Sequence, residues 1–357
     1  MVTFSKDVNV HIADGAGYTL TMESERVRAP NIRDVARLAG VSYQTVSRVL
    51  NNSESIRPST KQRVLEVIAE IGYRPNQAAR ALVTSKSRTL GVLSAQTAHY
   101  GPATSLQAIE TAAREAGYLI STTNLVSSDY ESIVENVEYL INQAVEGLVV
   151  ISPQVKVFDA IKDLAVTVPL VTLDSSGRDE PRSLSVDQIA GAKAATRHLI
   201  DLGHSEIVHL AGPQDWIEAE ARMQGFLEEV NDADLRTHPP ILGDWTAEFG
   251  YHAGRELLPY RDFSAVFAAN DQMALGLLHA FREYGLDVPR DISVVGFDDI
   301  PEARHYWPPL TTVRQDFTEI GRRAVAILLE EINGGTRMEN ARILPKLVVR
   351  GSTAFHR

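Results

Sequence analysis

A short segment, residues 31–51, carries the side chains with the most specific chemistry in this chain of 357 residues. From residue 43 to residue 50 the apolar positions recur at helical spacing, so the polar side chains between them share the opposite face. Those side chains are Tyr43, Gln44, Ser47 and Arg48. Arginine and glutamine form bidentate hydrogen bonds with the edges of guanine and adenine. The pattern therefore predicts a helix whose outer face can read bases in the major groove of DNA.

A preceding helix and a tight turn must position this face. Apolar spacing predicts the first helix over Ile32–Ala39, with residue 38 or residue 39 completing its inner side. Gly40 ends this helix, because glycine enters the left-handed conformation without steric cost. Ser42 suits the N-cap of the second helix, Tyr43–Leu50. Together these elements form a helix-turn-helix.

A third helix is expected to close the small core of this region. It begins near Pro58 and ends at Gly72, and four of its apolar side chains share one face: Val64, Val67, Ile68 and Ile71. The alternative is a helical hairpin with a polar outer face and no ligand. That alternative does not explain why the turn, the cap and the outward side chains all fit a DNA-binding helix-turn-helix.

Charge is divided unevenly along the chain, whose net charge is −11. Residues 28–90 contain eleven Lys and Arg but only four Asp and Glu, which gives a net charge of +7. The segment 1–27 carries −2, and the remainder, 91–357, carries −16. Basic charge thus collects around the predicted helix-turn-helix, where the phosphates of DNA would lie.

Composition excludes several other classes of protein. The chain is 44% hydrophobic, but it has no run of eighteen apolar residues and no apolar segment after a basic start. Neither a transmembrane helix nor a secretory signal is therefore expected. Cysteine is absent, which removes disulfides and thiolate metal ligands. We expect a cytoplasmic protein with no cofactor, no bound metal and no membrane contact.

Four segments are expected along the chain. Residues 1–28 form a polar extension that is expected to be disordered, and residues 29–75 form the helix-turn-helix domain. Residues 76–88 hold a short helix, Gln77–Leu82, and a polar linker. A helix of about two turns folds only when something packs on it, so an ordinary linker is the alternative. Residues 89–357 form the core.

The core alternates short apolar runs with amphipathic stretches. The runs are Leu90–Ala95, Tyr118–Thr123, Gly147–Ser152, Pro169–Asp174, Ile207–Ala211, Ala265–Asn270 and Ile292–Phe297. This alternation predicts an α/β fold of parallel, doubly wound sheets covered by helices on both faces. Its length favours two lobes. The first is expected over about 89–186 and 315–345, and the second over about 187–314 and 346–357.

Polar residues follow several of these runs, at the edge where open α/β sheets bind ligands. The residues are Asp174, Asn270, Asp271, Asp298 and Asp299, with Arg222 and Trp245 between them in sequence. Carboxylate, amide and guanidinium groups hydrogen-bond sugar hydroxyls, and an indole packs on the C–H face of a sugar ring. The set predicts a polyol site, although each such residue alone can also be a helix cap.

From residue 31 to residue 357 the chain resembles the lactose-repressor family of transcription regulators. The stretches that carry the resemblance are VSYQTVSRV, GDW, ANDQMALG, DISVVGFDD and PPLTTVRQDF. The resemblance implies a small all-α headpiece, a hinge helix at Asn76–Leu82, and a two-lobed core like that of periplasmic sugar-binding proteins. Such cores dimerise. Because the chain stops at Arg357 without a leucine heptad tail, a homodimer is expected rather than a tetramer.

By this resemblance the headpiece and hinge contact double-stranded operator DNA. Base reading is implied for Tyr43, Gln44 and Arg48. Contacts with phosphates, or orientation on them, are implied for Thr45, Ser47 and Asn51, and Ser42 is also expected to bind DNA. On the hinge helix the implied DNA-binding residues are Asn76, Ala79 and Leu82. Leu82 matches the leucine that wedges between the central base pairs from the minor groove.

The same resemblance implies a saccharide effector in the core. The residues that would hydrogen-bond its hydroxyls are Asp174, Arg222, Asn270 and Asp298. Aromatic walls and their neighbours would come from Trp245, Phe317, Gln315 and Pro102. The chain departs from the pattern at Ile151 and Glu218, where the matching positions carry asparagine and serine, and in the bulkier loop His99–Pro102. These departures leave the saccharide open, with a galactoside-type pyranose favoured.

We therefore expect a transcriptional repressor whose operator affinity is switched by a small sugar, an inducer of galactoside type. A different saccharide, or a co-repressed regulator, is the alternative. A periplasmic receptor would need an export signal and no headpiece, and a regulator with an unliganded core would not need the ring-gripping residues. An enzyme is not expected, because the chain lacks the motifs G-x-S-x-G, H-E-x-x-H, G-x-x-x-x-G-K and G-x-G-x-x-G.

Overall fold

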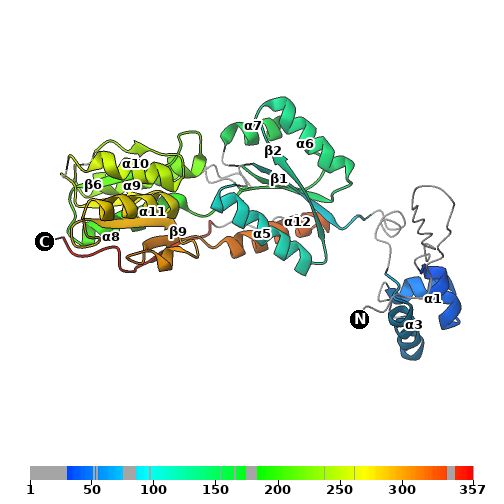
Figure 1. The fold of residues 1–357 in the computed structure, drawn as a ribbon. Coiled ribbons are helices and arrows are strands. Elements are labelled where there is room, and N and C mark those ends of the chain that lie inside the picture. Colours follow the sequence, from blue (N-terminus) through cyan, green and yellow to red (C-terminus); the bar gives the residue numbers. More distant parts are fainter. Residues whose placement is uncertain are drawn as a thin grey trace, which may run out of the picture. The chain divides into compact units, whose positions relative to one another are not determined.

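The chain divides into two compact units, one up to Ser85 and one from Lys86 onward (Figure 1). The computed structural model describes residues 30–50, 53, 55–74, 86–95, 98–152, 154–164, 166–173, 183–236, 238–260, 262–335 and 342–356. The predicted extension 1–28 and the predicted hinge helix Asn76–Leu82 lie outside these residues.

The described residues of the first unit form three helices with the predicted bounds, α1 (Ile32–Ala39), α2 (Tyr43–Leu50) and α3 (Pro58–Ile71). Asn31 caps α1 by a capping box, in which its side chain accepts from the Asp34 amide while the Asp34 carboxylate accepts from the Asn31 amide. Gly40 ends α1 with a positive φ of 61°, as the turn requires. The sequence prediction of a helix-turn-helix followed by a third helix is confirmed.

A cluster of small apolar side chains holds these helices together. Its buried members are Val35, Ala36, Ala39, Val46, Val49, Val64 and Val67. Ala39 is buried whereas Leu38 is 51% exposed, so Ala39 completes the inner face of α1. Burial of the valines on α2 turns its polar side chains outward, which fixes the face that the helix presents to solvent.

In the second unit the described residues form two sheets, and the strands of the first sheet all run parallel. Its order is β2-β1-β3-β4-β5. The strands are β1 (Thr89–Ala95), β2 (Leu119–Leu125), β3 (Gly147–Ile151), β4 (Leu170–Leu173) and β5 (Ser183–Leu184). Helices α5 (Tyr100–Glu115) and α12 (Phe317–Ile332) cover one face, and helices α6 (Tyr130–Asn142) and α7 (Val155–Asp163) the other. This sheet and its helices form the first lobe.

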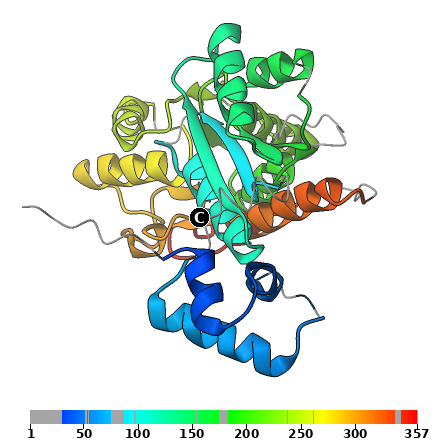
Figure 2. The same cartoon turned by 90° about the vertical axis from the view of Figure 1, so that its right-hand side faces the viewer.

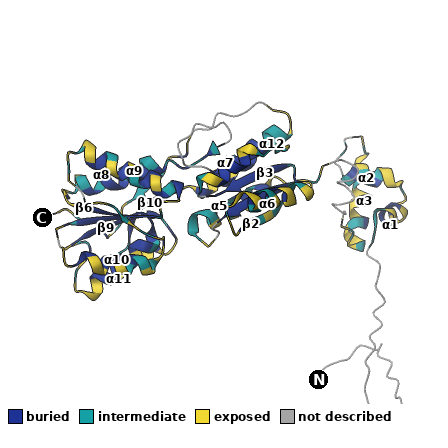
Figure 3. Ribbon diagram, turned by 90° about the horizontal axis from the view of Figure 1, so that it is seen from above, coloured by how far each residue is buried: buried dark blue, intermediate teal, exposed yellow. Residues whose placement is uncertain are grey.

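The second lobe is built on a sheet of order β11-β10-β9-β8-β6-β7. The strands are β6 (Ile207–Ala211), β7 (Ile241–Leu242), β8 (Ala265–Ala268), β9 (Ser293–Asp298), β10 (Thr311–Arg314) and β11 (Lys346–Val348). Figure 3 shows α8 (Gln188–Asp201) and α9 (Ile217–Asp232) on one face of it, and α10 (Ala247–Leu257) and α11 (Asp271–Glu283) on the other. The predicted doubly wound architecture is confirmed.

One strand departs from the expected parallel arrangement. At the edge of the second sheet β11 runs antiparallel to β10, with Leu347 opposite Val313. The chain reaches this edge from α12 in the first lobe, so it enters from the opposite end of the sheet. The direction of an edge strand therefore follows from where the chain crosses between lobes, which no local pattern in residues 346–348 records.

Three chain crossings join the two lobes. The first connects β5 to α8 and the second connects β10 to α12; α12 is orange in Figure 2 and packs on α5. The third leads into β11. The first and third run side by side, because Val186 pairs with Ile343 and the Asp187 amide donates to the Ile343 carbonyl at 2.9 Å. These crossings bring residues from distant parts of the sequence to the cleft between the sheets.

Candidate functional site

Helix α2 presents a polar outer face in the first unit. Tyr43 is 57% exposed, and Gln44 and Arg48 are also exposed. The Ser42 hydroxyl accepts a hydrogen bond from the Thr45 amide at 3.1 Å, which caps the helix as predicted. The side chains proposed to read bases are thus available on a capped helix. Thr45 and Ser47 are half-buried on the same helix, and Asn51, Asn76, Ala79 and Leu82 lie outside the described residues.

A cavity of about 420 Å³ lies between the two lobes of the second unit. Seven side chains that the sequence analysis singled out line it: Pro102, Arg222, Trp245, Asn270, Asp298, Gln315 and Phe317. Asp174 falls outside the described residues. Cavities of this size, with a few polar groups on apolar walls, are typical of small-molecule sites.

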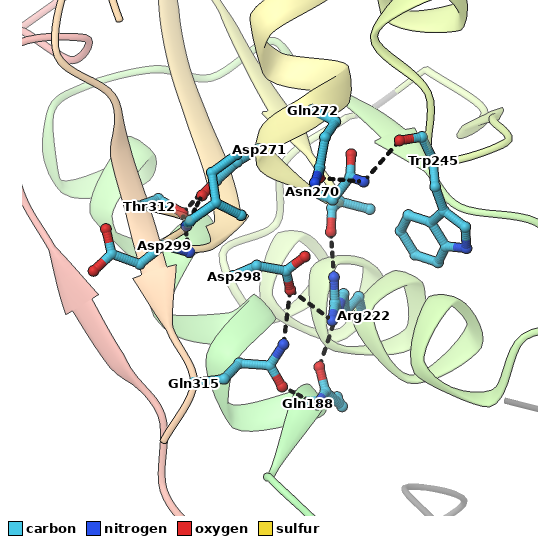
Figure 4. Close-up of polar contacts among 12 residues, drawn as sticks. Gln188, Arg222, Trp245, Asn270, Asp271, Gln272, Asp298, Asp299, Thr312 and Gln315 are labelled. Carbon is cyan, nitrogen blue, oxygen red and sulfur yellow. Dashed lines mark hydrogen bonds and ion pairs between the residues drawn. The ribbon is translucent and has the colours of Figure 1, made fainter. Parts of the chain in front are cut away.

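Arg222 organises the polar wall of the cavity (Figure 4). Its Nε donates to Gln188 Oε1 at 2.9 Å, its Nη1 donates to the Ala269 carbonyl, and its Nη2 lies 3.1 Å from Asp298 Oδ1. The guanidinium also stacks on Phe297, 3.9 Å from the ring centroid. Arg222 is 4% exposed, so its charge is compensated almost entirely by protein groups rather than by water.

Two glutamines extend this network across the chain crossings. Gln188 begins α8 just after the first crossing, and its Nε2 donates to Gln315 Oε1 at 2.7 Å. Gln315 lies in the second crossing and donates in turn to Asp298 Oδ1 at 2.7 Å. The four side chains Arg222, Gln188, Gln315 and Asp298 form a closed ring of hydrogen bonds, which we call the polar ring. It ties two of the three crossings to the end of β9.

Asp298 ends β9 in an unusual backbone conformation, with a φ of 102°. Residues other than glycine adopt such values only at a cost, which the polar ring offsets by holding the carboxylate. Burial raises the pKa of Asp298, and the Arg222 guanidinium and the Gln315 amide oppose that rise. The side chain is placed to accept hydroxyl donors once a ligand enters beside it.

Asn270 has a structural task as well as a place on the cavity wall. Its Oδ1 accepts from the Met273 amide at 2.9 Å and caps α11, while its Nδ2 donates to the Trp245 carbonyl and to Gln272 Oε1, both at 2.9 Å. Both donors are therefore used within the protein. Asn270 holds the loop that carries Trp245 and leaves an acceptor lone pair for a ligand.

Trp245 forms the flat aromatic wall of the cavity. Its backbone has a φ of 73°, and its ring lies directly over Gly212, where a Cβ atom would collide with the indole. The Arg222 guanidinium lies 5.5 Å from the ring centroid. Trp245 Nε1 is buried without a hydrogen-bond partner. A flat apolar wall beside polar groups is the arrangement that binds the two kinds of surface on a pyranose.

Several lining residues were not singled out in the sequence analysis as site residues. They include Gln188, Trp216 and Tyr100. Trp216 could have been found, because it follows the apolar run Ile207–Ala211 just as Asp298 follows its own strand. No local pattern marked Gln188 as a site residue, because its hydrogen-bond partner Gln315 is 127 residues away in the sequence. Ile151 and Glu218, the two departures from the family pattern, also line the cavity.

The two walls differ in chemistry. The second lobe and the crossing at Gln315 contribute the charged and amide side chains, whereas the first lobe contributes mainly apolar ones: Ile151, Leu173, Leu184, Phe317 and Ile320. Within the described ranges no group of three His, Cys, Asp or Glu side chains is placed to hold a metal ion. None of the helices in the described part of the chain has the length and apolar character needed to cross a membrane.

Comparisons with known proteins match both units. Residues 31–76 match the family of bacterial regulatory proteins, lacI family, and residues 196–353 match the periplasmic binding protein-like domain. The lactose operon repressor of Escherichia coli strain K12 is 34% identical over 324 residues, which are 90% of each chain. The HTH-type transcriptional repressor PurR of Pasteurella multocida strain Pm70 is also 34% identical, over 90% of this chain and 98% of that protein.

Solved structures give the same result. The crystal structure of the Lac repressor dimer bound to operator and the anti-inducer ONPF is 33% identical to this chain and superposes with a TM-score of 0.82. The match covers 92% of this chain and all of that one. The likeness therefore extends over both units of the chain.

Proposed function

Since this chain belongs to the lacI family of bacterial regulatory proteins, and is thus a DNA-binding transcriptional repressor with a ligand-binding core, we propose that its ligand is a saccharide inducer of galactoside type. The observation that carries this proposal is the polar ring beside Trp245. It offers hydroxyl acceptors and a flat apolar wall within one cavity. That combination suits a pyranose, whose edge bears hydroxyls and whose faces expose C–H groups.

We propose that the DNA-bound form is a homodimer on a near-palindromic operator. The Lac repressor structure that the chain resembles is a dimer bound to operator. Two-fold symmetry of the protein is mirrored in the half-sites of the DNA, and each recognition helix enters one major groove. In this proposal Tyr43, Gln44 and Arg48 read bases, and Leu82 wedges into the minor groove.

The switch follows from where the ligand would bind. A saccharide in the cavity contacts both lobes, so it favours the conformation in which they are closest. In this proposal closure shifts the first lobe against its dimer partner, and the hinge helices separate and lose their mutual packing. The ligand can shift this equilibrium only by its preference for the closed state.

The test uses the full chain and an operator selected from random duplexes with the purified protein. Fluorescence anisotropy then follows release of the labelled operator during titration with methyl β-galactoside and with lactose. We expect the affinity for the operator to fall. We also expect the temperature of unfolding to rise, since a ligand at a hundred times its Kd adds about 2.7 kcal/mol to stability. Tighter operator binding on adding sugar would make the protein a co-repressed regulator. Absence of any effect across galactosides and other saccharides would reject a sugar effector.

A further inference from the structure

We propose that the cavity contains a second ring-binding subsite, formed by Trp216, Glu218 and His99, and that the effector is therefore a saccharide of at least two rings. This inference rests on the proposed function and specifies its ligand. The first ring lies against the polar ring and Trp245, and the second lies toward the N-terminal end of α9. All three side chains of the subsite line the same cavity as Arg222.

Helix geometry places Glu218 one turn before Arg222 on α9. Glu218 and Arg222 are four residues apart on α9, so both side chains lie on one face of the helix and both line the cavity. At a rise of about 1.5 Å per residue, their positions are about 6 Å apart along the helix axis. The polar groups of the cavity thus extend one turn past the polar ring.

Aromatic rings line the same end of the cavity as Glu218. Trp216 lies edge-on to Trp245 with centroids 5.4 Å apart, and His99 lies edge-on to Trp216 at 5.0 Å. The three rings come from three different loops, after β6, after β7 and after β1. The row therefore continues from the wall of the first ring to a second aromatic wall. Packing of pyranose C–H groups on aromatic faces is the contact that such a row provides.

The subsite spans the two lobes. His99 belongs to the first lobe and Trp216 to the second, and the neighbouring residues Gln154 and Asp215 also meet across the lobes at 3.0 Å. A second ring held here would contact both lobes outside the polar ring. It would therefore add to the preference for the closed state that the switch requires.

The charge of Glu218 narrows the class of saccharide further. The side chain of Glu218 offers carboxyl oxygens as hydrogen-bond acceptors, so it favours hydroxyl donors on the second ring. A phosphate or carboxylate on that ring would be repelled. The ligand class is thus a neutral disaccharide, or a longer saccharide, rather than a sugar phosphate.

The test compares each disaccharide with the methyl glycoside of its own non-reducing ring, using calorimetric titration of the full chain. The pairs are lactose with methyl β-galactoside, melibiose with methyl α-galactoside, cellobiose with methyl β-glucoside, and maltose with methyl α-glucoside. We expect at least one disaccharide to bind about tenfold more tightly than its partner, the gain of one aromatic contact and one hydrogen bond.

Variants then test which side chains give the disaccharide its higher affinity. Trp216→Leu and Glu218→Gln should lower the affinity for the disaccharide more than the affinity for its methyl glycoside. Glu220→Gln is the matched control, because Glu220 is an exposed carboxylate in the same first turn of α9. Equal losses for both members of a pair, or no gain for any disaccharide, would reject the subsite while leaving the sugar effector intact. Failure of every saccharide to bind the parent would reject the proposed function itself.

Discussion

Arg222 and Asp298 form a buried ion pair, with Nη2 3.1 Å from Oδ1 and less than a tenth of either side chain exposed. Arg222 comes from α9 and Asp298 from the end of β9, so the pair joins a helix to the carboxyl edge of the second sheet. Each charge is also hydrogen-bonded by a glutamine of the polar ring. The same side chains thus support the fold and form the wall on which we propose that the ligand binds.

Removing one partner of this ion pair should separate its role in stability from its role in ligand binding. Asp298→Ala leaves the Arg222 guanidinium buried without its counter-charge, which costs about 3–5 kcal/mol of stability. We expect the variant still to bind operator but no longer to release it with sugar. Denaturant unfolding and operator titration measure the two effects. The double variant with Arg222→Leu should regain stability without regaining sugar response; parental sugar affinity in Asp298→Ala would show that the proposed site is misplaced.

Arg48→Ala should weaken operator binding by about 1–3 kcal/mol and relax the preference at one base pair, because a bidentate contact with a base edge is lost. This prediction rests on the exposed position of Arg48 on the capped helix α2. Binding to single-base operator variants measures the preference. An equal loss on the operator and on random duplex would mean that Arg48 contacts phosphates rather than bases.

Gly212→Ala should displace the indole of Trp245 from the cavity wall, because a Cβ at this position collides with the ring. We expect weaker saccharide binding and a red-shifted tryptophan emission in the free protein. Gly101→Ala is the control, since a Cβ at Gly101 meets no atom within 4 Å. Unchanged emission and affinity in Gly212→Ala would show that Trp245 can move away without consequence for the site.

His209 should make the stability of the core depend on pH. Its ring packs against the rings of Phe226 and Phe267, Nδ1 lies 2.9 Å from the Phe267 carbonyl, and burial lowers its pKa to about 4. In the unfolded chain the histidine has a pKa near 6.5. Between pH 6.5 and 4 it is therefore protonated in the unfolded chain but neutral in the folded core. Stability is therefore complete above about pH 6.5 and falls as the pH drops toward 4, by about 3 kcal/mol.

The histidine prediction is checked by denaturant unfolding of the parent and of His209→Gln over this range of pH. Glutamine retains an N–H donor but does not titrate, so the slope should become shallower in the variant. Burial also lowers the pKa of His99, His198 and His204, which contribute a slope of the same sign in both proteins. Identical slopes in the two proteins would exclude His209 as a source of the pH dependence.

Local patterns in the sequence determined the elements and several of their caps. The bounds of α1 and α2 follow from apolar spacing, the Gly40 turn and the Ser42 cap, all of which act within a few residues. The apolar runs of the core became strands with their ends shifted by only a few residues. Polar residues such as Asn270 and Asp298 could be identified because the ends of parallel strands meet at one edge of a sheet.

Only the tertiary structure decided how these residues meet. Gln188 bonds Gln315 across 127 residues, and His99 contacts Trp216 across the two lobes, because three chain crossings bring these segments together. The same crossings reverse β11. The sequence predicted Asn270 as a sugar contact, and only the structure shows that its amide donors also hold the Trp245 loop. Local periodicity reports which face of an element is buried, but not which distant side chain will satisfy a polar group there.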